Sequence, residues 1–190
     1  MIGEPHTVGG VDVIYDRGAG GRARAGAVVL AFPGLTLVDQ AVAEESSAAP
    51  YQPGEFSLRE APAALAALAR LRTRPDVLLC DGHGRAHPRR RGLACHIGAE
   101  LDVPTVGVAK SILVGTHGAL GRERGSIAPL VDGGETIGVA LRTQSGVKPV
   151  YVSVGHAIEL EEAVRLVLAC APRYRLPETT RLADRLSREG

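Results

Sequence analysis

The apolar positions of the chain fall into segments of two kinds. In the N-terminal quarter, short segments rich in valine, alanine and leucine are separated by a glycine-rich turn and a Pro-Gly turn. Such segments bounded by turn residues are typical of β-strands. They predict an N-terminal meander of three strands, over residues 11–15, 25–32 and 36–45.

The rest of the chain alternates helical periodicity with short apolar runs. Segments 76–80 and 105–109 are continuous and apolar, as expected of strands buried on both faces. Two later strands, which can form a hairpin, are predicted over 134–142 and 147–154, with 116–126 in a loop. Apolar residues at helical spacing predict helices over 60–71, 91–101, 160–170 and 178–186. The pattern predicts an α/β fold: a mixed central sheet, antiparallel first and then parallel, with helices on both faces and one domain spanning 1–190.

Composition adds little by itself. Hydrophobic content is 45% and charged content 23%, and the three cysteines lack the spacing of zinc ligands or a disulfide framework. No apolar run reaches the roughly 18 residues that a membrane span needs, so we expect no membrane association and a cytoplasmic location. Charge is uneven along the chain: residues 35–60 carry five acids against one arginine, a net of −4, and residues 84–100 carry four arginines against one acid, a net of +3. That pairing suits a protein that holds both metal and phosphate, although on composition alone a solvated basic turn beside an ordinary acidic face is the better explanation.

Three acidic residues stand where folding alone does not require them. Asp12 interrupts an apolar strand, Asp81 follows the buried strand 76–80, and Glu60 begins a predicted helix. A carboxylate in or beside a buried strand is costly unless it is paired, hydrogen-bonded or bound to metal. Simpler explanations remain for two of them, because Glu60 suits a helix N-terminus and Asp81 suits a turn before glycine. A shared metal site requires these distant segments to converge, which spacing alone does not establish.

Several motifs closely resemble those of the endonuclease V family, in the same order and over nearly the whole chain. They are GVDV at 10–13, PYQPG at 50–54, LREAP at 58–62, DGHGRAHPR at 81–89, GVAKS at 107–111, KPVYVSVGH at 148–156, and YRLPE with TRLAD at 174–184. The resemblance implies a ribonuclease H-like fold and a magnesium-dependent endonuclease, in which Mn²⁺ should also support activity. It further implies that Asp12 and Asp81 are direct metal ligands, that Glu60 acts through a metal-bound water or as a further ligand, and that Asp184 is the fourth acid. Lys110 would contact the scissile phosphate or orient the attacking water; otherwise it is a surface lysine.

The resemblance also implies the substrate contacts. Pro50, Tyr51 and Pro53 match a rigid wedge that enters the duplex at the lesion, where an aromatic ring replaces the flipped base. The matching positions of the base pocket, where backbone groups approach the base edge, are Gly54, Gly82, Gly92, Gly107 and Ala109. His87 would assist substrate positioning, and Arg89, Arg90 and Arg91 would hold phosphates. Taken singly, each glycine is explained as a turn residue and the histidine as a local hydrogen-bond partner.

The function that the resemblance implies is DNA repair: nicking at the second phosphodiester bond 3′ to deoxyinosine, which leaves 3′-hydroxyl and 5′-phosphate ends. The expected partner is DNA containing deoxyinosine, or inosine-containing RNA, and the expected state is a monomer. Two alternatives stay open. One is a ribonuclease directed at inosine, or an enzyme acting on branched or flapped DNA; the other is a lesion-binding module without catalysis, against which the full set of acids argues, because clustered acids repel phosphate.

Overall fold

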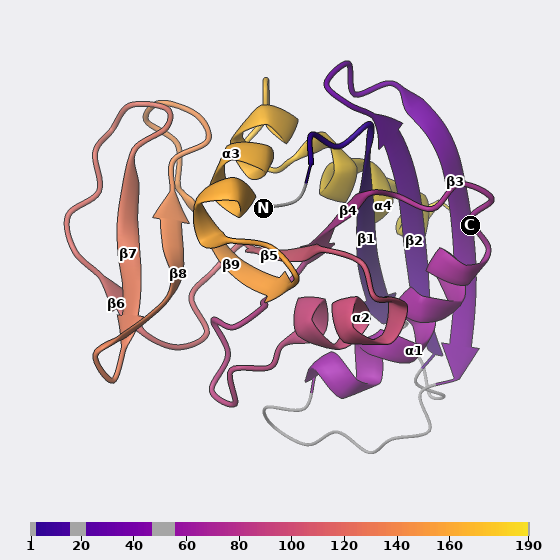
Figure 1. Cartoon of the computed structure of the whole chain (residues 1–190). Helices are drawn as coiled ribbons and strands as arrows, with labels where there is room; N and C mark the ends of the chain where they lie inside the picture. Colours follow the sequence, from indigo (N-terminus) through magenta and orange to yellow (C-terminus); the bar gives the residue numbers. More distant parts are fainter. Residues whose placement is uncertain (1–2, 16–21, 47–55, 190) are drawn as a thin grey trace.

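A computed structural model describes residues 3–15, 22–46 and 56–189 of the chain. Its centre is a nine-stranded sheet in the order β3-β2-β1-β4-β5-β9-β8-β7-β6 (Figure 1). The N-terminal meander consists of β1 (Thr7–Tyr15), β2 (Arg22–Ala31) and β3 (Leu37–Ser46), paired antiparallel. The parallel part consists of β1, β4 (Val77–Asp81) and β5 (Thr105–Ala109). The predicted mixed sheet is confirmed.

The far half of the sheet is antiparallel. It contains β9 (Val150–His156), β8 (Glu135–Leu141), β7 (Ile127–Asp132) and the short β6 (Thr116–His117). The predicted pairing of the two late strands is confirmed, since Val139 of β8 lies opposite Val152 of β9. The prediction of an uninterrupted loop over 116–126 is wrong, because Thr116 and His117 pair with β7. Neither β6 nor β7 was predicted: β6 has two residues, too few for a periodic signal, and Pro129 interrupts β7.

Helices cover both faces of the sheet, as predicted. On one face α1 (Phe56–Ala69) and α2 (Leu93–Leu101) pack on a core that includes Val11 and Cys80. On the other face α3 (Leu160–Cys170) packs on a core that includes Val8 and Leu79. Helix α4 (Glu178–Arg188) lies on β1 and β2. The alternation along β1 therefore sends Val8 and Val11 to opposite faces, as the period of a strand requires.

The starts of two elements differ from the prediction in ways that matter for the site. The first strand begins at Thr7 rather than residue 11, because Gly9 and Gly10 extend the pairing with β2 and β4. Helix α1 begins at Phe56, not at Glu60. Glu60 therefore lies in the second turn of the helix, so the interpretation of Glu60 as a helix-start residue is wrong.

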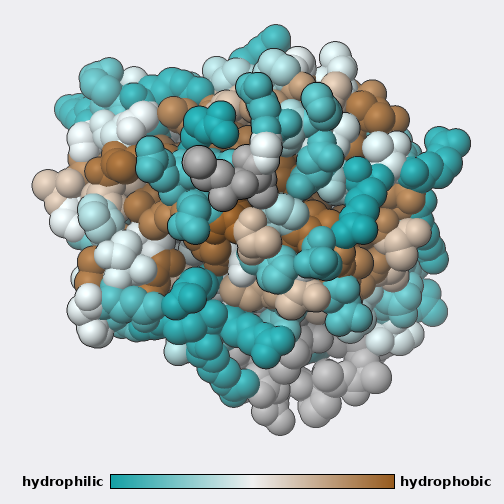
Figure 2. Space-filling view, viewed as in Figure 1, coloured by the Kyte–Doolittle hydropathy of each residue, from teal (hydrophilic) through white to brown (hydrophobic). Residues whose placement is uncertain are grey.

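Hydrophilic and hydrophobic side chains are interspersed on the surface. Figure 2 shows one face on which hydrophilic residues lie between hydrophobic ones. The large apolar side chains that are exposed come from several parts of the chain. Leu37 and Val38 belong to β3, whereas Ile127 belongs to β7. Over the described ranges, no helix has both the length and the apolar character to cross a membrane.

Candidate active site

Two acidic residues meet because their strands are neighbours in register. Val11 of β1 pairs with Cys80 of β4 in the parallel part of the sheet. Asp12 and Asp81 are the next residues on each strand, so they lie side by side. Asp12 is 5% exposed, and Asp81 is the last residue of β4. The unusual placement of both residues beside apolar segments is thus explained by their shared position, directly after the parallel pairing of β1 with β4.

A third acid reaches this position from α4, which lies unusually close to the sheet. A Cβ atom at Gly10 would stand 2.3 Å from the backbone oxygen of Thr179, and one at Gly26 would stand 2.4 Å from that of Ala183. Only glycine at these positions of β1 and β2 leaves room for the helix backbone. The consequence is that one carboxylate oxygen from each of Asp12, Asp81 and Asp184 lies within 4.8 Å of the others.

Burial, followed by the closeness of the acids to one another, dominates the electrostatics of this cluster. Burial, the hydrogen bond with Asp81 and the charges of Asp81 and Asp184 raise the pKa of Asp12 to about 7. Ser187 works in the opposite direction, because its Oγ donates a hydrogen bond to Oδ2 of Asp12 at 3.0 Å. Carboxylates that are this crowded share protons unless a cation takes their place. Three hard oxygen donors within this distance fit a divalent cation such as Mg²⁺ or Mn²⁺.

Glu60 lies beside this cluster, although it is not among the three carboxylates that share one potential cation position. Burial, followed by repulsion from Asp12 and Asp81, raises the pKa of Glu60 to about 8. The carboxylate of Glu60, on α1, is therefore close enough to both aspartates to be repelled by their charges. This placement suits a group that acts through a water molecule better than one that binds an ion directly.

Two basic residues balance part of this negative charge. The ammonium of Lys110, directly after β5, forms an ion pair with Asp81. Burial opposes the charge of Lys110, yet the hydrogen bond to Asp81 and the charges of the acids raise its pKa overall. On α4, Arg188 binds both carboxylate oxygens of Asp184, at 2.7 and 3.0 Å, and this hydrogen bonding lowers the pKa of Asp184. Lys110 is therefore no isolated surface lysine.

Three of the residues predicted to form the base pocket, Gly82, Gly92 and Gly107, lie in or against the loop that joins β4 to α2, here called the 82–92 loop. Gly82 has a φ of +147°, a conformation that favours glycine. A Cβ at Gly107 would stand 2.3 Å from the backbone nitrogen of Gly84, and one at Gly92 would stand 2.3 Å from the backbone oxygen of His83. Close backbone packing within the protein thus explains Gly92 and Gly107, and their contact with a base stays a prediction. Ala109 is buried at the end of β5.

The remaining predicted substrate contacts are more varied. His87 is 5% exposed, and its Nδ1 accepts a hydrogen bond from the backbone nitrogen of Arg89 at 3.2 Å. Burial lowers the pKa of His87, and the hydrogen bond at Nδ1 makes its ring a partner of the local backbone. The side chain of Arg89 is exposed in the same loop. The predicted wedge residues Pro50, Tyr51 and Pro53, together with Gly54, lie outside the described residues.

Sequence reasoning missed two residues of this site, Ser187 and Arg188. They follow Asp184 by three and four positions, the spacing that places side chains on one face of a helix. The prediction ended the last helix at residue 186, whereas α4 continues to Arg188. A helix extended by two residues would have placed both beside Asp184.

Carboxylates gathered beside the parallel strands, with a lysine against them, are compatible with a site for metal-assisted hydrolysis of phosphodiesters. The sequence profile of the Endonuclease V family matches residues 2–185. Endonuclease V of Roseiflexus castenholzii (strain DSM 13941 / HLO8) is 56% identical over 189 residues, which cover 100% of this chain and 84% of that protein. The chain therefore belongs to the endonuclease V family, and it is a nuclease that hydrolyses phosphodiester bonds.

Solved structures agree with this assignment. The crystal structure of endonuclease V from Streptomyces avermitilis matches with a TM-score of 0.93 and 49% identity, over 97% of this chain and 81% of that one. Endonuclease V from Ciona intestinalis, in complex with a 24mer DNA containing an inosine followed by a ribo-adenosine, matches with a TM-score of 0.82 and 29% identity, over 98% of this chain and 86% of that one. The expected ribonuclease H-like fold is confirmed.

Proposed function

We propose that this nuclease acts on DNA containing deoxyinosine, which it nicks at the second phosphodiester bond 3′ to the lesion to leave 3′-hydroxyl and 5′-phosphate ends. The observation that carries the proposal is the convergence of Asp12, Asp81 and Asp184 within 4.8 Å. The inosine-containing DNA bound by the Ciona intestinalis relative supports the choice of substrate.

In this proposal Asp12, Asp81 and Asp184 hold Mg²⁺, or Mn²⁺ in its place. The ion would polarise the phosphate and lower the pKa of nearby water. Lys110, which lies against Asp81, orients the scissile phosphate or the attacking water. Glu60 acts from the edge of the cluster, as a water-mediated or additional ligand.

The lesion base is recognised outside the helical stack, because a stacked base hides part of its edges. Hypoxanthine presents a carbonyl and a ring N–H where adenine presents an amine and a bare ring nitrogen. Fixed backbone N–H and C=O groups can distinguish the two patterns. The 82–92 loop, with Gly82 at its start beside Asp81, supplies such groups next to the acids.

The test compares isosteric Asp→Asn variants. Asp12→Asn and Asp81→Asn should lower nicking of an inosine-containing duplex in Mg²⁺ by more than the roughly 10- to 100-fold expected for a residue that only supports a ligand. Binding of the same duplex in Ca²⁺ should persist. Asp102→Asn is the matched control, because its side chain is 95% exposed and its left-handed backbone conformation also suits asparagine. Wild-type nicking rates in both site variants would refute the proposal.

A second candidate substrate is inosine in RNA. It is favoured by the ribo-adenosine that follows the inosine in the DNA bound to the Ciona intestinalis relative. Matched DNA, RNA and chimeric strands, each with inosine or adenosine at one position, separate the two substrates. Faster cleavage of the all-RNA strand than of the DNA strand would assign the protein as an inosine-directed ribonuclease.

Two further expectations belong to this proposal, a monomeric state and a cytoplasmic location. A monomer is expected because the substrate has one lesion in one strand, and a single copy of the site is enough to bind and cleave it. Light scattering of the purified protein tests the first, and fractionation of the source cells tests the second.

A further inference from the structure

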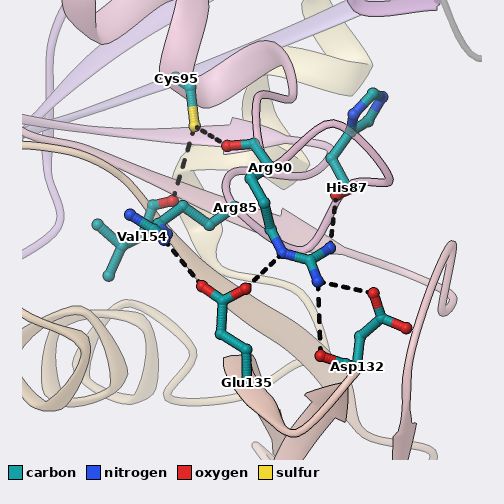
Figure 3. A network of polar contacts seen from close by, with 7 residues as sticks. All are labelled: Arg85, His87, Arg90, Cys95, Asp132, Glu135 and Val154. Atoms are coloured by element: carbon teal, nitrogen blue, oxygen red, sulfur yellow. Dashed lines mark hydrogen bonds and ion pairs between the residues drawn. The ribbon is translucent and has the colours of Figure 1, made fainter.

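The 82–92 loop is tied to a distant part of the sheet by a network of ion pairs. Figure 3 shows the guanidinium of Arg90 directed at two acids of the β7–β8 hairpin. Its Nε lies 2.8 Å from Oε2 of Glu135, and one terminal nitrogen lies 2.7 Å from Oδ2 of Asp132. Arg85 binds the other oxygen of Glu135 at 2.9 Å. Two arginines of the loop thus hold the turn between β7 and β8.

The guanidinium of Arg90 is committed to this network. Besides the two carboxylates, it donates to the backbone oxygen of His87 at 3.1 Å, while the His87 ring turns away from it (Figure 3). The side chain is 27% exposed, and hydrogen bonds to Glu135 and Asp132 raise its pKa. A phosphate would have to displace two carboxylates to reach it. This contrasts with the expectation that Arg90 holds phosphate.

The rest of the loop is anchored on a different element. The backbone nitrogen of Gly84 donates to Oγ of Ser153 at 2.9 Å, and that of Arg85 donates to the backbone oxygen of Val154 at 2.8 Å. Both acceptors belong to β9. The start of the loop is therefore fixed on β9, whereas Arg90 fixes its far end on the hairpin.

The backbone at Arg90 supports the same interpretation. Its φ is +55°, the left-handed region that a side chain with a Cβ rarely adopts. Such a conformation persists only where surrounding contacts hold it. The ion pairs with Asp132 and Glu135 are contacts of that kind.

We propose that Arg90, Asp132 and Glu135 form a clamp that positions the 82–92 loop, and with it the backbone groups that recognise the lesion base, without any contact between Arg90 and nucleic acid. The inference rests on the proposed function insofar as the loop recognises the base. The hairpin is then a support for specificity, and Arg90 is a positioning residue.

The experiment uses variants for which the two possible roles of Arg90 predict opposite results. Arg90→Gln removes a positive charge, whereas the double variant Asp132→Asn/Glu135→Gln removes two negative ones and leaves every cation in place. If Arg90 positions the loop, both variants should lower the single-turnover rate on an inosine strand about tenfold, and both should reduce the preference for inosine over adenosine. Arg173→Gln, an exposed arginine between α3 and α4 with the same charge change, should keep that preference.

Salt dependence of binding gives the second readout. A residue that contacts phosphate contributes about one unit to the slope of log K against log salt. The slope for Arg90→Gln should equal that of the wild type. A slope reduced by about one, together with tighter binding and undiminished cleavage by the acid-to-amide variant, would overturn the clamp and assign Arg90 to phosphate binding.

Hydrogen exchange separates this inference from the proposed function. The amides of residues 84, 85, 87, 90 and 92 should exchange faster in both clamp variants, at an unchanged midpoint of thermal unfolding, whether or not the protein acts on inosine. Unchanged exchange refutes the clamp. If exchange is faster in the clamp variants but the wild-type protein does not cleave inosine-containing strands, the clamp stands and the proposed function is refuted instead.

Discussion

Gly26 of β2 is the position at which a single methyl group should separate the acids of the site. A Cβ there would stand 2.4 Å from the backbone oxygen of Ala183 and 2.8 Å from the backbone nitrogen of Ser187. Ordinary contact begins at 3.4 Å, so α4 must retreat by about 1 Å. The strand has no room to move in the other direction, because α1 packs on its opposite face.

The retreat carries Asp184 away from Asp12 and Asp81. Misplacement of a reacting arrangement by about 1 Å costs on the order of 100-fold in rate. Overpacking of the helix against the sheet should also cost about 1–3 kcal/mol of unfolding free energy. We therefore expect Gly26→Ala to lower the single-turnover nicking rate about 100-fold while the protein remains folded.

The assay measures nicking of the inosine duplex with enzyme in excess, alongside urea unfolding followed by circular dichroism. Gly118→Ala is the matched control, because no atom lies within 4 Å of its Cβ position. It should change neither quantity appreciably. A Gly26→Ala enzyme with the wild-type rate and stability would show that the position of α4 does not set the geometry of the acids.

Three further changes probe single interactions of the site. Ser187→Ala removes a hydrogen bond that lowers the pKa of Asp12, so the acid limb of the pH–rate profile should move to higher pH and the rate should fall about tenfold. Lys110→Met should lower the rate constant about 100-fold with unchanged binding in Ca²⁺, whereas a fall in binding alone would place Lys110 at a remote phosphate. In chelator, folded Asp12 keeps its proton up to about pH 7, whereas the unfolded carboxyl loses it near 3.8, so unfolding free energy should fall as pH rises through this window. Denaturation at pH 5 and pH 8 checks this sign, and Asp12→Asn should flatten the dependence.

The elements that could be predicted from the sequence are those whose packing requires a regular pattern of apolar residues. Strand β5 was predicted with its observed bounds because both of its faces are buried and its apolar run is continuous. The start of α1 was missed by four residues, since the residues before Glu60 carry no alanine–leucine periodicity. Strand β7 was missed because it contains Pro129, and a proline within an apolar run argues against a strand.

Two of the three clustered acids could also be recognised as candidate site residues from the sequence. Asp12 and Asp81 stood out because one interrupts an apolar strand and the other directly follows one, placements that local folding does not favour. Asp184 carried no such signal, since an acid on an amphipathic helix is ordinary, and only the resemblance to endonuclease V pointed to it. Arg90 looked like part of a basic cluster for phosphate, yet its partners come from a hairpin more than 40 residues away in the chain.

The sequence by itself determined the α/β class, most of the strands, the helices and the family, because periodicity and motif order are properties of neighbouring residues. Only the tertiary structure decided that β1 and β4 pair in the register that sets Asp12 beside Asp81. Only it decided that Gly10 and Gly26 admit α4 close enough to add Asp184. The reason is physical: distances between residues far apart in the chain depend on register and on close packing, which no local pattern encodes.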